Sequence, residues 1–367
     1  MNWNYIQPVE IIFGNGKLSE LAKLTQKSKH ILLVSDPFFQ QNGLVDKIKS
    51  ILGNILVFDE ISPNPDVKEV NRCSALIREK QIDTILALGG GSSMDLAKAA
   101  SIRAERMEDY HDGKKVVPAD HIPVIAIPTT SGTGSEVTSV AVLTNRKTGK
   151  KAPVVSDSFY PKVALIDPEI TLSLPPYMTA STGIDVLCHA VEGYWSRGHQ
   201  PICDALAIHA IKLVLQNLVN ACHNGKDKEA REKLSEASVI AGLAFSLPKT
   251  TACHACSFPL TNIYHIPHGE ACGLTLDYFI KINAGDKRTQ ELVHCLGYET
   301  VNDFANTVKD LKKELHLRIN LEEFSLSEDE IQELVQLSHH PNLNNNPVSV
   351  TDEILSDLYY ELGGKKK

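Results

Sequence analysis

Hydrophobic and polar positions follow two different patterns along the chain. Over the first 167 residues, short runs of aliphatic and β-branched residues recur between turn residues. Amphipathic segments such as VKEVNRCSALIREK (67–80) separate several of them. This alternation predicts a largely parallel α/β sheet with helices on its faces. The strand-like runs are VEIIF (9–13), HILLVS (30–35), NILVFD (54–59), DTILALG (83–89), PVIAIP (123–128) and KVALID (162–167).

The pattern changes after DPEITLSLPP (167–176), where strand-like runs stop. Apolar positions then recur at helical spacing, as in residues 204–222 and 228–246. A last helix is expected to begin near Thr351, a suitable N-cap, after the polar loop NLNNNP (342–347). We therefore predict an α/β N-terminal domain over residues 1–167 and an all-α C-terminal domain over residues 168–367.

Composition and charge narrow the classes of function. The chain of 367 residues has a formal net charge of −8 and no basic block except the terminal GGKKK, so nucleic acid is not expected as a ligand. The first residues do not resemble a signal peptide, and no apolar run has the length of a membrane span. Eight scattered cysteines fit reduced thiols better than a disulfide framework. These features predict a cytoplasmic protein with no nucleic-acid or membrane partner.

The segment DTILALGGGSSMDLAKAA (83–100) combines a buried strand, three glycines and an amphipathic helix. The glycines permit a sharp bend and a close approach of a ligand to the backbone. Ser92 and Ser93 are expected at the N-cap, where free N–H groups and the helix dipole attract phosphate. A tight turn with no ligand is the alternative. Because the motif follows the fourth run and is not G-x-G-x-x-G, an ordinary Rossmann strand order is disfavoured.

A second loop, PTTSGTGSEVT (128–138), follows the strand-like run PVIAIP. Its hydroxyls, including Thr129, Thr130 and Thr133, could bind the phosphate or nicotinamide end of a dinucleotide, or simply form a polar turn. Both loops should leave the same edge of a parallel sheet, where ligands bind in such folds. Asp36, at the end of HILLVSD, could accept hydrogen bonds from ribose hydroxyls or act as a turn former.

Two segments could share a metal ion. Asp185 and His189 are four residues apart in ASTGIDVLCHAVEGYW (180–195), so they lie on one face of a helix with apolar neighbours. The segment TACHACSFPLTNIYHIPHGEACG (251–273) adds His254 and His268. One carboxylate and three imidazoles suit Fe(II) or Zn(II) with a position left for a substrate oxygen.

The same segment holds two weaker signals. Cys253 and Cys256 form a single C-x-x-C with no second pair to complete a zinc knuckle. His265, three residues before His268, is a candidate for a contact to the substrate or to a ligand.

Together these motifs resemble the iron-containing (group III) alcohol dehydrogenase family over nearly the whole chain. The resemblance implies a dehydroquinate synthase-like fold, with an α/β dinucleotide-binding domain, a helical domain and a metal in the cleft between them. The matching segments are IIFGNGKL (11–18), PNPDV (63–67), GGGSSMDLAK (89–98), PTTSGTGSEVT (128–138), PKVALIDPEIT (161–171), GIDVLCHAVEGYWS (183–196) and PHGEA (267–271).

The resemblance also implies site residues. Its metal ligands fall on Asp185, His189, His254 and His268, with Fe(II) as the expected metal and Zn(II) as the alternative. Asp36 at its position goes with NAD(H), and a homodimer or larger homo-oligomer is expected. The implied cofactor contacts are Asp36, Asn64, Gly90, Gly91, Ser92, Thr129, Thr130, Thr133 and Lys151.

One departure narrows the expected substrate. Many members carry a histidine four residues after the third ligand, where this chain has Phe258. The local pattern HACSFPLT resembles the subgroup that reduces phosphonoacetaldehyde to 2-hydroxyethylphosphonate. A phosphonate tail would need cations or donors near the metal. The candidates are Lys249 and Arg197, with hydroxyl groups from Ser257 and Thr250; solvated surface charges are the alternative for the two cations. The proton for the alkoxide could come from water, from the cofactor ribose hydroxyls or, as the weaker option, from His265.

Other functions remain open at this point. The chain could be a general iron-dependent alcohol dehydrogenase acting on neutral short-chain alcohols. A glycerol-1-phosphate dehydrogenase or a dehydroquinate synthase could share the fold, although the Asp-x₃-His spacing favours the alcohol dehydrogenases. A non-catalytic NAD-binding assembly protein is a further alternative, which the presence of all four expected ligands disfavours.

Overall fold

The computed structural model describes residues 2–365 and divides them into two compact units. The sheet unit comprises Ile6–Thr130 and Gly134–Thr171. The helical unit comprises the chain from Leu172 onward, together with Ser131–Thr133 and the residues up to Tyr5. Each unit has hydrophobic clusters of its own.

The sheet unit is built on six parallel strands in the order β1-β8-β5-β4-β2-β3. All six predicted strand-like runs form strands of this sheet, and the order differs from a Rossmann sheet. Its central strands are almost wholly buried, as expected when helices cover both faces. The strands are β1 (Glu10–Phe13), β2 (Ile31–Ser35), β3 (Leu56–Phe58), β4 (Thr84–Gly89), β5 (Val124–Pro128) and β8 (Val163–Ile166).

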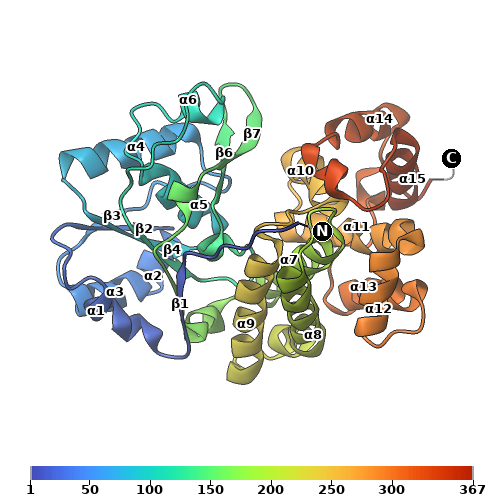
Figure 1. Cartoon of the computed structure of the whole chain (residues 1–367), viewed down its shortest axis with the longest axis horizontal. Coiled ribbons are helices and arrows are strands. Elements are labelled where there is room, and N and C mark those ends of the chain that lie inside the picture. The colour runs from blue at the N-terminus through green and yellow to red at the C-terminus, as the bar shows by residue number, and fades with distance from the viewer. Residues whose placement is uncertain (1, 366–367) are drawn as a thin grey trace. The chain divides into compact units, whose positions relative to one another are not determined.

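Helices pack on both faces of this sheet (Figure 1). One face contacts α4 (Val67–Glu79) and α5 (Gly91–Ala100), and the other contacts α1 (Leu21–Leu24) and α3 (Leu44–Leu52). Helix α4 begins with a capping box. The Asp66 side chain accepts a hydrogen bond from the Glu69 backbone N–H, and the Glu69 side chain accepts one from the Asp66 backbone N–H. The short helices α2 (Phe38–Gln41) and α6 (Glu108–His111) complete the unit.

An antiparallel hairpin was not predicted from the sequence. It pairs β6 (Val140–Asn145) with β7 (Lys150–Val155) as a separate two-stranded sheet. The β7 sequence, KKAPVV, carries two lysines and a proline and is mostly exposed, so it lacks the apolar pattern of a core strand. The hairpin forms because β6 buries alternate residues against α5.

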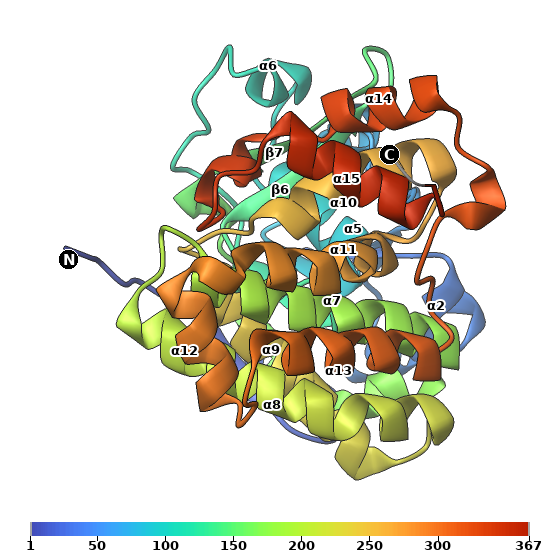
Figure 2. The ribbon, with the colours of Figure 1, turned by 90° about the vertical axis from the view of Figure 1, so that its right-hand side faces the viewer.

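The helical unit is a bundle around α7 (Pro176–Trp195), which is buried on nearly all sides (Figure 2). It packs against α8 (Pro201–His223), α9 (Lys228–Phe245) and α11 (His268–Ile282). Thr351 caps the last helix by accepting a hydrogen bond from the Ile354 N–H at 3.3 Å, as predicted. The other helices are α10 (Ala252–Tyr264), α12 (Lys287–Cys295), α13 (Val301–Glu314), α14 (Glu328–Leu337) and α15 (Asp352–Leu362).

Helix α8 is the one described helix that is long and apolar enough to cross a membrane. Length and composition alone give that result, and core helices of globular proteins give it too. In this structure α8 makes extensive contacts with α7 and α9. It is therefore described as a helix of the bundle.

Glycines bring α7 and α11 unusually close. A Cβ atom on Gly269 would lie 2.1 Å from the Ser181 carbonyl oxygen and 2.8 Å from Cβ of Asp185. One turn later, a Cβ on Gly273 would lie 2.6 Å from the Ile184 side chain. Only residues without a side chain fit at this crossing. The start of α11 is thereby held against the middle of α7.

Candidate metal centre and dinucleotide cradle

Helix α7 presents three ionisable side chains along one side. Asp185, His189 and Glu192 occupy positions i, i+4 and i+7, which share a face of a helix. All three residues are at most 5% exposed. Buried charges of this kind need ion partners or a metal.

Two other helices bring their first turns to this face. His254 lies in the first turn of α10, and His268 is the first residue of α11 after Pro267. Cys272 follows His268 by one helical turn, so it lies on the same side of α11. The close crossing of α7 and α11 places both residues near Asp185.

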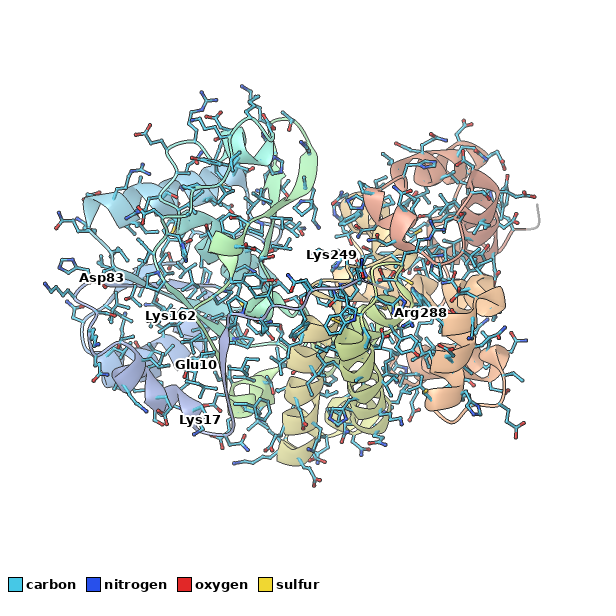
Figure 3. All side chains as sticks on the ribbon, in the orientation of Figure 1. Glu10, Lys17, Asp83, Lys162, Lys249 and Arg288 are labelled. Atoms are coloured by element: carbon cyan, nitrogen blue, oxygen red, sulfur yellow. The ribbon has the colours of Figure 1, made fainter. Side chains whose placement is uncertain are left out.

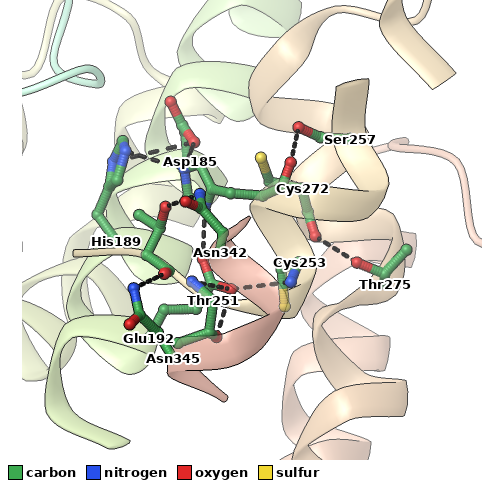
Figure 4. Close-up of polar contacts among 12 residues, drawn as sticks. Asp185, His189, Glu192, Thr251, Cys253, Ser257, Cys272, Thr275, Asn342 and Asn345 are labelled. Atoms are coloured by element: carbon green, nitrogen blue, oxygen red, sulfur yellow. Dashed lines mark hydrogen bonds and ion pairs between the residues drawn. The ribbon is translucent and has the colours of Figure 1, made fainter. Parts of the chain in front are cut away.

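The donor atoms of these residues converge. The Nε2 atoms of His189 and His254 are 3.0 Å apart, and His254 Nε2 is 3.6 Å from an oxygen of Asp185. Donor atoms of Asp185, His254, His268 and Cys272 all lie within 4.8 Å of one another. Figure 4 shows Asp185 and His189 side by side on α7, with Cys272 facing them from α11.

This donor set fits a divalent metal ion. Oδ1 of Asp185 is buried and has no hydrogen-bond partner among the described residues, which is costly unless a ligand takes that place. Two imidazole nitrogens at 3.0 Å are at a spacing that one shared cation can explain. Asp185, His189, His254 and His268 could thus hold the ion, with mixed oxygen and nitrogen donors suited to Fe(II) or Zn(II).

Glu192 is a functional candidate that the sequence analysis missed. One of its carboxylate oxygens accepts hydrogen bonds from the Thr251 N–H at 3.1 Å and from the Cys253 N–H at 2.8 Å, at the N-terminus of α10. The other oxygen contacts Nδ1 of His254, so the imidazole is oriented with Nε2 toward the donor cluster. The sequence feature that could have identified Glu192 is its position three residues after His189 on the same helix.

The electrostatics of the cluster reflect its burial. Burial raises the pKa of Asp185 to about 7, against the opposing effect of His254. Burial also lowers the pKa of His189 well below its usual value. For His254 burial acts in the same downward direction, but the Glu192 carboxylate outweighs it and the net pKa is raised. The cluster therefore penalises charge wherever no partner compensates it.

Cys272 was also missed as a neighbour of the cluster. Its Sγ lies 3.8 Å from Nε2 of His268, and its position four residues after His268 was the available signal. Cys253 and Cys256 are buried free thiols outside the group of converging donors. All eight cysteines lie in the described part of the chain and are free, in agreement with the prediction of reduced thiols.

In the sheet unit, the glycine-rich turn lies between β4 and α5. Gly89 has φ of 151°, and a Cβ there would lie 2.3 Å from the Ser93 hydroxyl, so this position requires glycine. The expected serine N-cap was wrong. The N-cap is Gly90, α5 begins at Gly91, and no described side chain caps the first turn. The backbone N–H groups at this terminus therefore remain suited to a phosphate.

The second loop lies beside this turn. The Thr129 N–H donates to the Gly89 carbonyl at 3.1 Å, and Gly90 faces Thr130. The hydroxyl of Thr129 is buried without a hydrogen-bond partner among the described residues, as expected where a ligand would bind. Thr133 belongs by its contacts to the helical unit.

Of three more candidate cofactor residues, Asn64 and Lys151 contact each other, and Asp36 lies separately at the end of β2. Lys151 donates to the Asn64 side chain at 2.8 Å, and the Asn64 N–H donates to the Ser92 hydroxyl at 3.3 Å. Asn64 holds a left-handed backbone with φ of 55°, a conformation often found at functional sites. One of the carboxylate oxygens of Asp36 accepts a hydrogen bond from the Phe38 N–H at 2.8 Å, which stabilises a local turn.

Buried charges fix the second loop against α5. Lys98 is completely buried and donates to the Ser135 carbonyl at 2.8 Å and to the Ser135 hydroxyl at 2.7 Å. Its ammonium lies 3.7 Å from Asp95. Next to this contact, burial raises the pKa of Glu136 to about 7. The loop is thus held against α5 by the hydrogen bonds of a completely buried lysine.

The candidate substrate residues Lys249, Arg197, Ser257 and His265 differ in burial. Lys249 is partly buried beside the start of α10 and donates to the Ser246 carbonyl at 2.7 Å (Figure 3). Arg197 is exposed, and its guanidinium binds the Pro347 carbonyl and the Ser349 hydroxyl.

Ser257 and His265 also differ in burial, since Ser257 is buried and His265 is exposed. The Ser257 hydroxyl is buried, donates to the His254 carbonyl at 2.8 Å and lies 3.3 Å from Nδ1 of His268. His265 is exposed and ends α10 with a left-handed backbone. Ser257 is therefore placed to orient His268, and His265 lies at the surface.

Comparison with known proteins identifies the family. Residues 8–168 match the family model of the iron-containing alcohol dehydrogenases, and residues 179–362 match the model of the C-terminal part of that family. The chain belongs to the iron-containing alcohol dehydrogenase family. The predicted fold class and the prediction of an enzyme are confirmed by this membership.

Relatives within the iron-containing alcohol dehydrogenases differ in substrate and in cofactor. Sulfoacetaldehyde reductase from Bifidobacterium kashiwanohense, solved in complex with NAD+, is 51% identical with a TM-score of 0.97, covering 100% of both chains. The NADPH-dependent butanol dehydrogenase of Clostridium saccharobutylicum is 34% identical, covering 90% of this chain and 89% of its own. The NAD-dependent methanol dehydrogenase of Bacillus methanolicus is 33% identical, covering 80% of each.

Proposed function

We propose that this alcohol dehydrogenase reduces a two-carbon aldehyde with an anionic tail, sulfoacetaldehyde first, to the corresponding primary alcohol with NADH. The observation that carries the proposal is the 51% identity to a sulfoacetaldehyde reductase over the whole of both chains. The overall reaction consumes the aldehyde, NADH and one proton and yields the alcohol and NAD+.

Phosphonoacetaldehyde is the second candidate substrate. It shares with sulfoacetaldehyde a reactive carbonyl next to a tetrahedral anion, and the segment HACSFPLT (254–261) favours it by resemblance. A third possibility, reduction of neutral short-chain aldehydes, has support from the butanol and methanol dehydrogenases among the relatives. A partly buried cation favours the anionic substrates, because Lys249 has no carboxylate partner among the described residues.

In this proposal Asp185, His189, His254 and His268 hold the metal, and Fe(II) is the first candidate with Zn(II) the second. When bound, the metal supplies Lewis-acid chemistry and the nicotinamide supplies the reducing equivalents. Glu192 orients His254, and Ser257 orients His268, so that both rings present Nε2. The apolar side chains around them exclude water from the donor cluster.

The cofactor contacts are proposed for the sheet unit. The N-terminus of α5 and the Thr129 hydroxyl supply donors for phosphate, while Asn64 and Lys151 add polar contacts. The carboxylate of Asp36 would repel a 2′-phosphate, which favours NADH over NADPH. Both nucleotides should therefore be compared in the assay below.

The first prediction is a substrate preference. Anaerobically Fe(II)-loaded protein should oxidise NADH with a kcat/KM for sulfoacetaldehyde at least tenfold above that for propionaldehyde, a difference of about 1.4 kcal/mol in transition-state stabilisation. Phosphonoacetaldehyde measured alongside decides between the two anions. Equal or faster turnover of propionaldehyde would remove the anionic substrates and leave a general alcohol dehydrogenase.

A further inference from the structure

A polar loop near the C-terminus packs against the segment that leads into α10. The loop contains the short 3₁₀ helix η7 (Pro341–Asn345). The Asn342 side chain donates to the Thr250 hydroxyl at 2.8 Å, and the Asn345 side chain donates to the Thr250 carbonyl at 3.2 Å (Figure 4). The next residue, Thr251, bonds Glu192, which contacts the candidate ligand His254. The loop is therefore tied to the donor cluster by a short series of hydrogen bonds.

His340 begins this loop and has a defined tautomer. The backbone N–H of Asn342 donates to Nδ1 of His340 at 3.2 Å. Because Nδ1 accepts this bond, the ring proton of neutral His340 resides on Nε2. Protonation of Nδ1 would place two donors against each other. His340 therefore offers one N–H donor, at Nε2.

Phe258 connects His340 to the candidate metal ligands. Its ring centroid lies 4.7 Å from that of His340 and 6.3 Å from that of His268. The Phe258 ring thus contacts both His340 and the candidate metal ligand His268. Burial lowers the pKa of His340 against the opposing effect of a hydrogen bond with the Asn342 side chain, and His254 acts in the same direction as burial.

Lys249 supplies a cation on the same segment. It directly precedes Thr250, on which the loop docks, and its backbone has a positive φ of 68°. A lysine seldom adopts this conformation, and such strain is concentrated at functional sites. Among the described residues its ammonium bonds a backbone carbonyl alone, and desolvation lowers its pKa. The segment therefore holds the Lys249 ammonium in place by a backbone carbonyl, with no carboxylate partner among the described residues.

From these contacts we infer that His340 is a specificity-determining residue, whose Nε2–H donates a hydrogen bond to the anionic tail of the substrate beside the Lys249 ammonium. The inference rests on the proposed function and assigns residues to it. A sulfonate or phosphonate oxygen accepts such bonds well, and a neutral aldehyde has no group to use them. The polar loop 340–345 is then the wall of the site that selects the tail, while the metal ligands act on the carbonyl end.

The test uses the metal-loaded enzyme and two variants of the same position. His340→Phe keeps an aromatic ring against Phe258 but removes the donor, and His340→Gln keeps an N–H donor near the position of Nε2. KM and kcat are measured for sulfoacetaldehyde and for propionaldehyde. Ethanesulfonate, which has the tail and no carbonyl, is used as an inhibitor of propionaldehyde reduction.

We expect His340→Phe to raise KM for sulfoacetaldehyde and the inhibition constant of ethanesulfonate by about tenfold or more, as for loss of a hydrogen bond to a charged group. Its constants for propionaldehyde should stay within about twofold of wild type, and His340→Gln should recover most of the loss. The adjacent His339, exposed and paired with Asp352 at 3.0 Å, provides the matched control. His339→Phe should leave KM and kcat unchanged for both substrates.

Other outcomes separate the two proposals. A wild-type preference for sulfoacetaldehyde together with equal effects of His340→Phe on both substrates would overturn the role of His340 and leave the proposed function in place. If His339→Phe raised KM for sulfoacetaldehyde as much as His340→Phe does, the role of His340 would likewise be overturned. A wild-type enzyme with no preference and no inhibition by ethanesulfonate would remove the proposed function, and the role of His340 with it.

Discussion

Glu192 shows how a residue beside the candidate metal ligands can organise two elements at once. It satisfies backbone N–H groups at the start of α10 and orients His254 through Nδ1. A carboxylate at a helix N-terminus is favoured by the helix dipole, and a carboxylate behind a histidine raises the basicity of the coordinating nitrogen. Both effects come from one buried charge on α7.

The replacement Glu192→Gln should lower metal affinity by about 10 to 100-fold, because a neutral amide orients and polarises His254 less well. Affinity is measured by competition with a chromogenic chelator, independently of activity. Glu270→Gln is the matched control, since Glu270 is a buried carboxylate of the same unit whose partners are Tyr177 and Arg318. Unchanged affinity in Glu192→Gln, or an equal loss in the control, would contradict this role.

At the residue scale, local spacing decided what the sequence could reveal. Asp185 and His189 could be paired because four residues on a helix bring side chains together. The contact between Glu192 and His254 spans 62 positions, so no local pattern contains it. His340 was missed for the same reason, since its relation to Phe258 exists only after α10 and the loop have folded together.

At the scale of elements, the crossing of α7 and α11 sets the geometry of the donor cluster. Gly269 and Gly273 allow backbone contact between the helices, and His268 directly precedes the first of them. Any added side chain would push α11 away from Asp185. The distance between candidate ligands on the two helices therefore depends on two glycines.

The replacement Gly269→Ala should destabilise the protein by about 2 kcal/mol or more, because its Cβ would overlap the backbone of α7. It should also weaken metal binding. Urea unfolding of the metal-free protein and the chelator assay measure the two effects. Gly285→Ala is the control, because no described atom lies within 4 Å of a Cβ at that position. Equal stability of the two variants would argue against the close crossing.

The elements themselves were predictable where their apolar residues follow a regular pattern. The six parallel strands are short apolar runs between turn residues, and the long helices carry clear periodicity. The β6–β7 hairpin escaped prediction because β7 is exposed and charged, so that its strand character comes from pairing with β6. The start of α5 was misplaced because glycine, not serine, occupies the N-cap.

At the scale of the whole molecule, charge has to act locally. The chain carries a formal net charge of −8, which repels a small anion at a distance. In the proposed function, an anionic tail is recognised locally by donors such as Lys249, which has no carboxylate partner in the described part of the chain. Buried charges elsewhere, such as Lys98 and Glu136, make stability depend on pH.

Glu136 gives that dependence a direction. Burial raises its folded-state pKa from 4.5 to about 7, so the folded state binds more protons than the unfolded state between these values. Its contribution to stability is complete below about pH 4.5 and is lost as the pH rises through about 7. Glu136→Gln should therefore gain stability relative to wild type from pH 5 to pH 8, by up to about 3 kcal/mol. Thermal unfolding at each pH measures this, and a difference that does not vary with pH would contradict it.

The pairing of β1 with β8 has a consequence for synthesis on the ribosome. Glu10 pairs with Val163, and Asp167 accepts hydrogen bonds from the Gly16 and Leu18 N–H groups, so the first strand finds its partner only when residue 167 has emerged. At about 5–20 residues per second, β1 waits for roughly 8 to 30 s with its edge unsatisfied. During that interval the nascent chain presents an open strand edge, and a chaperone that shields roughly its first 20 residues should raise the yield of folded protein.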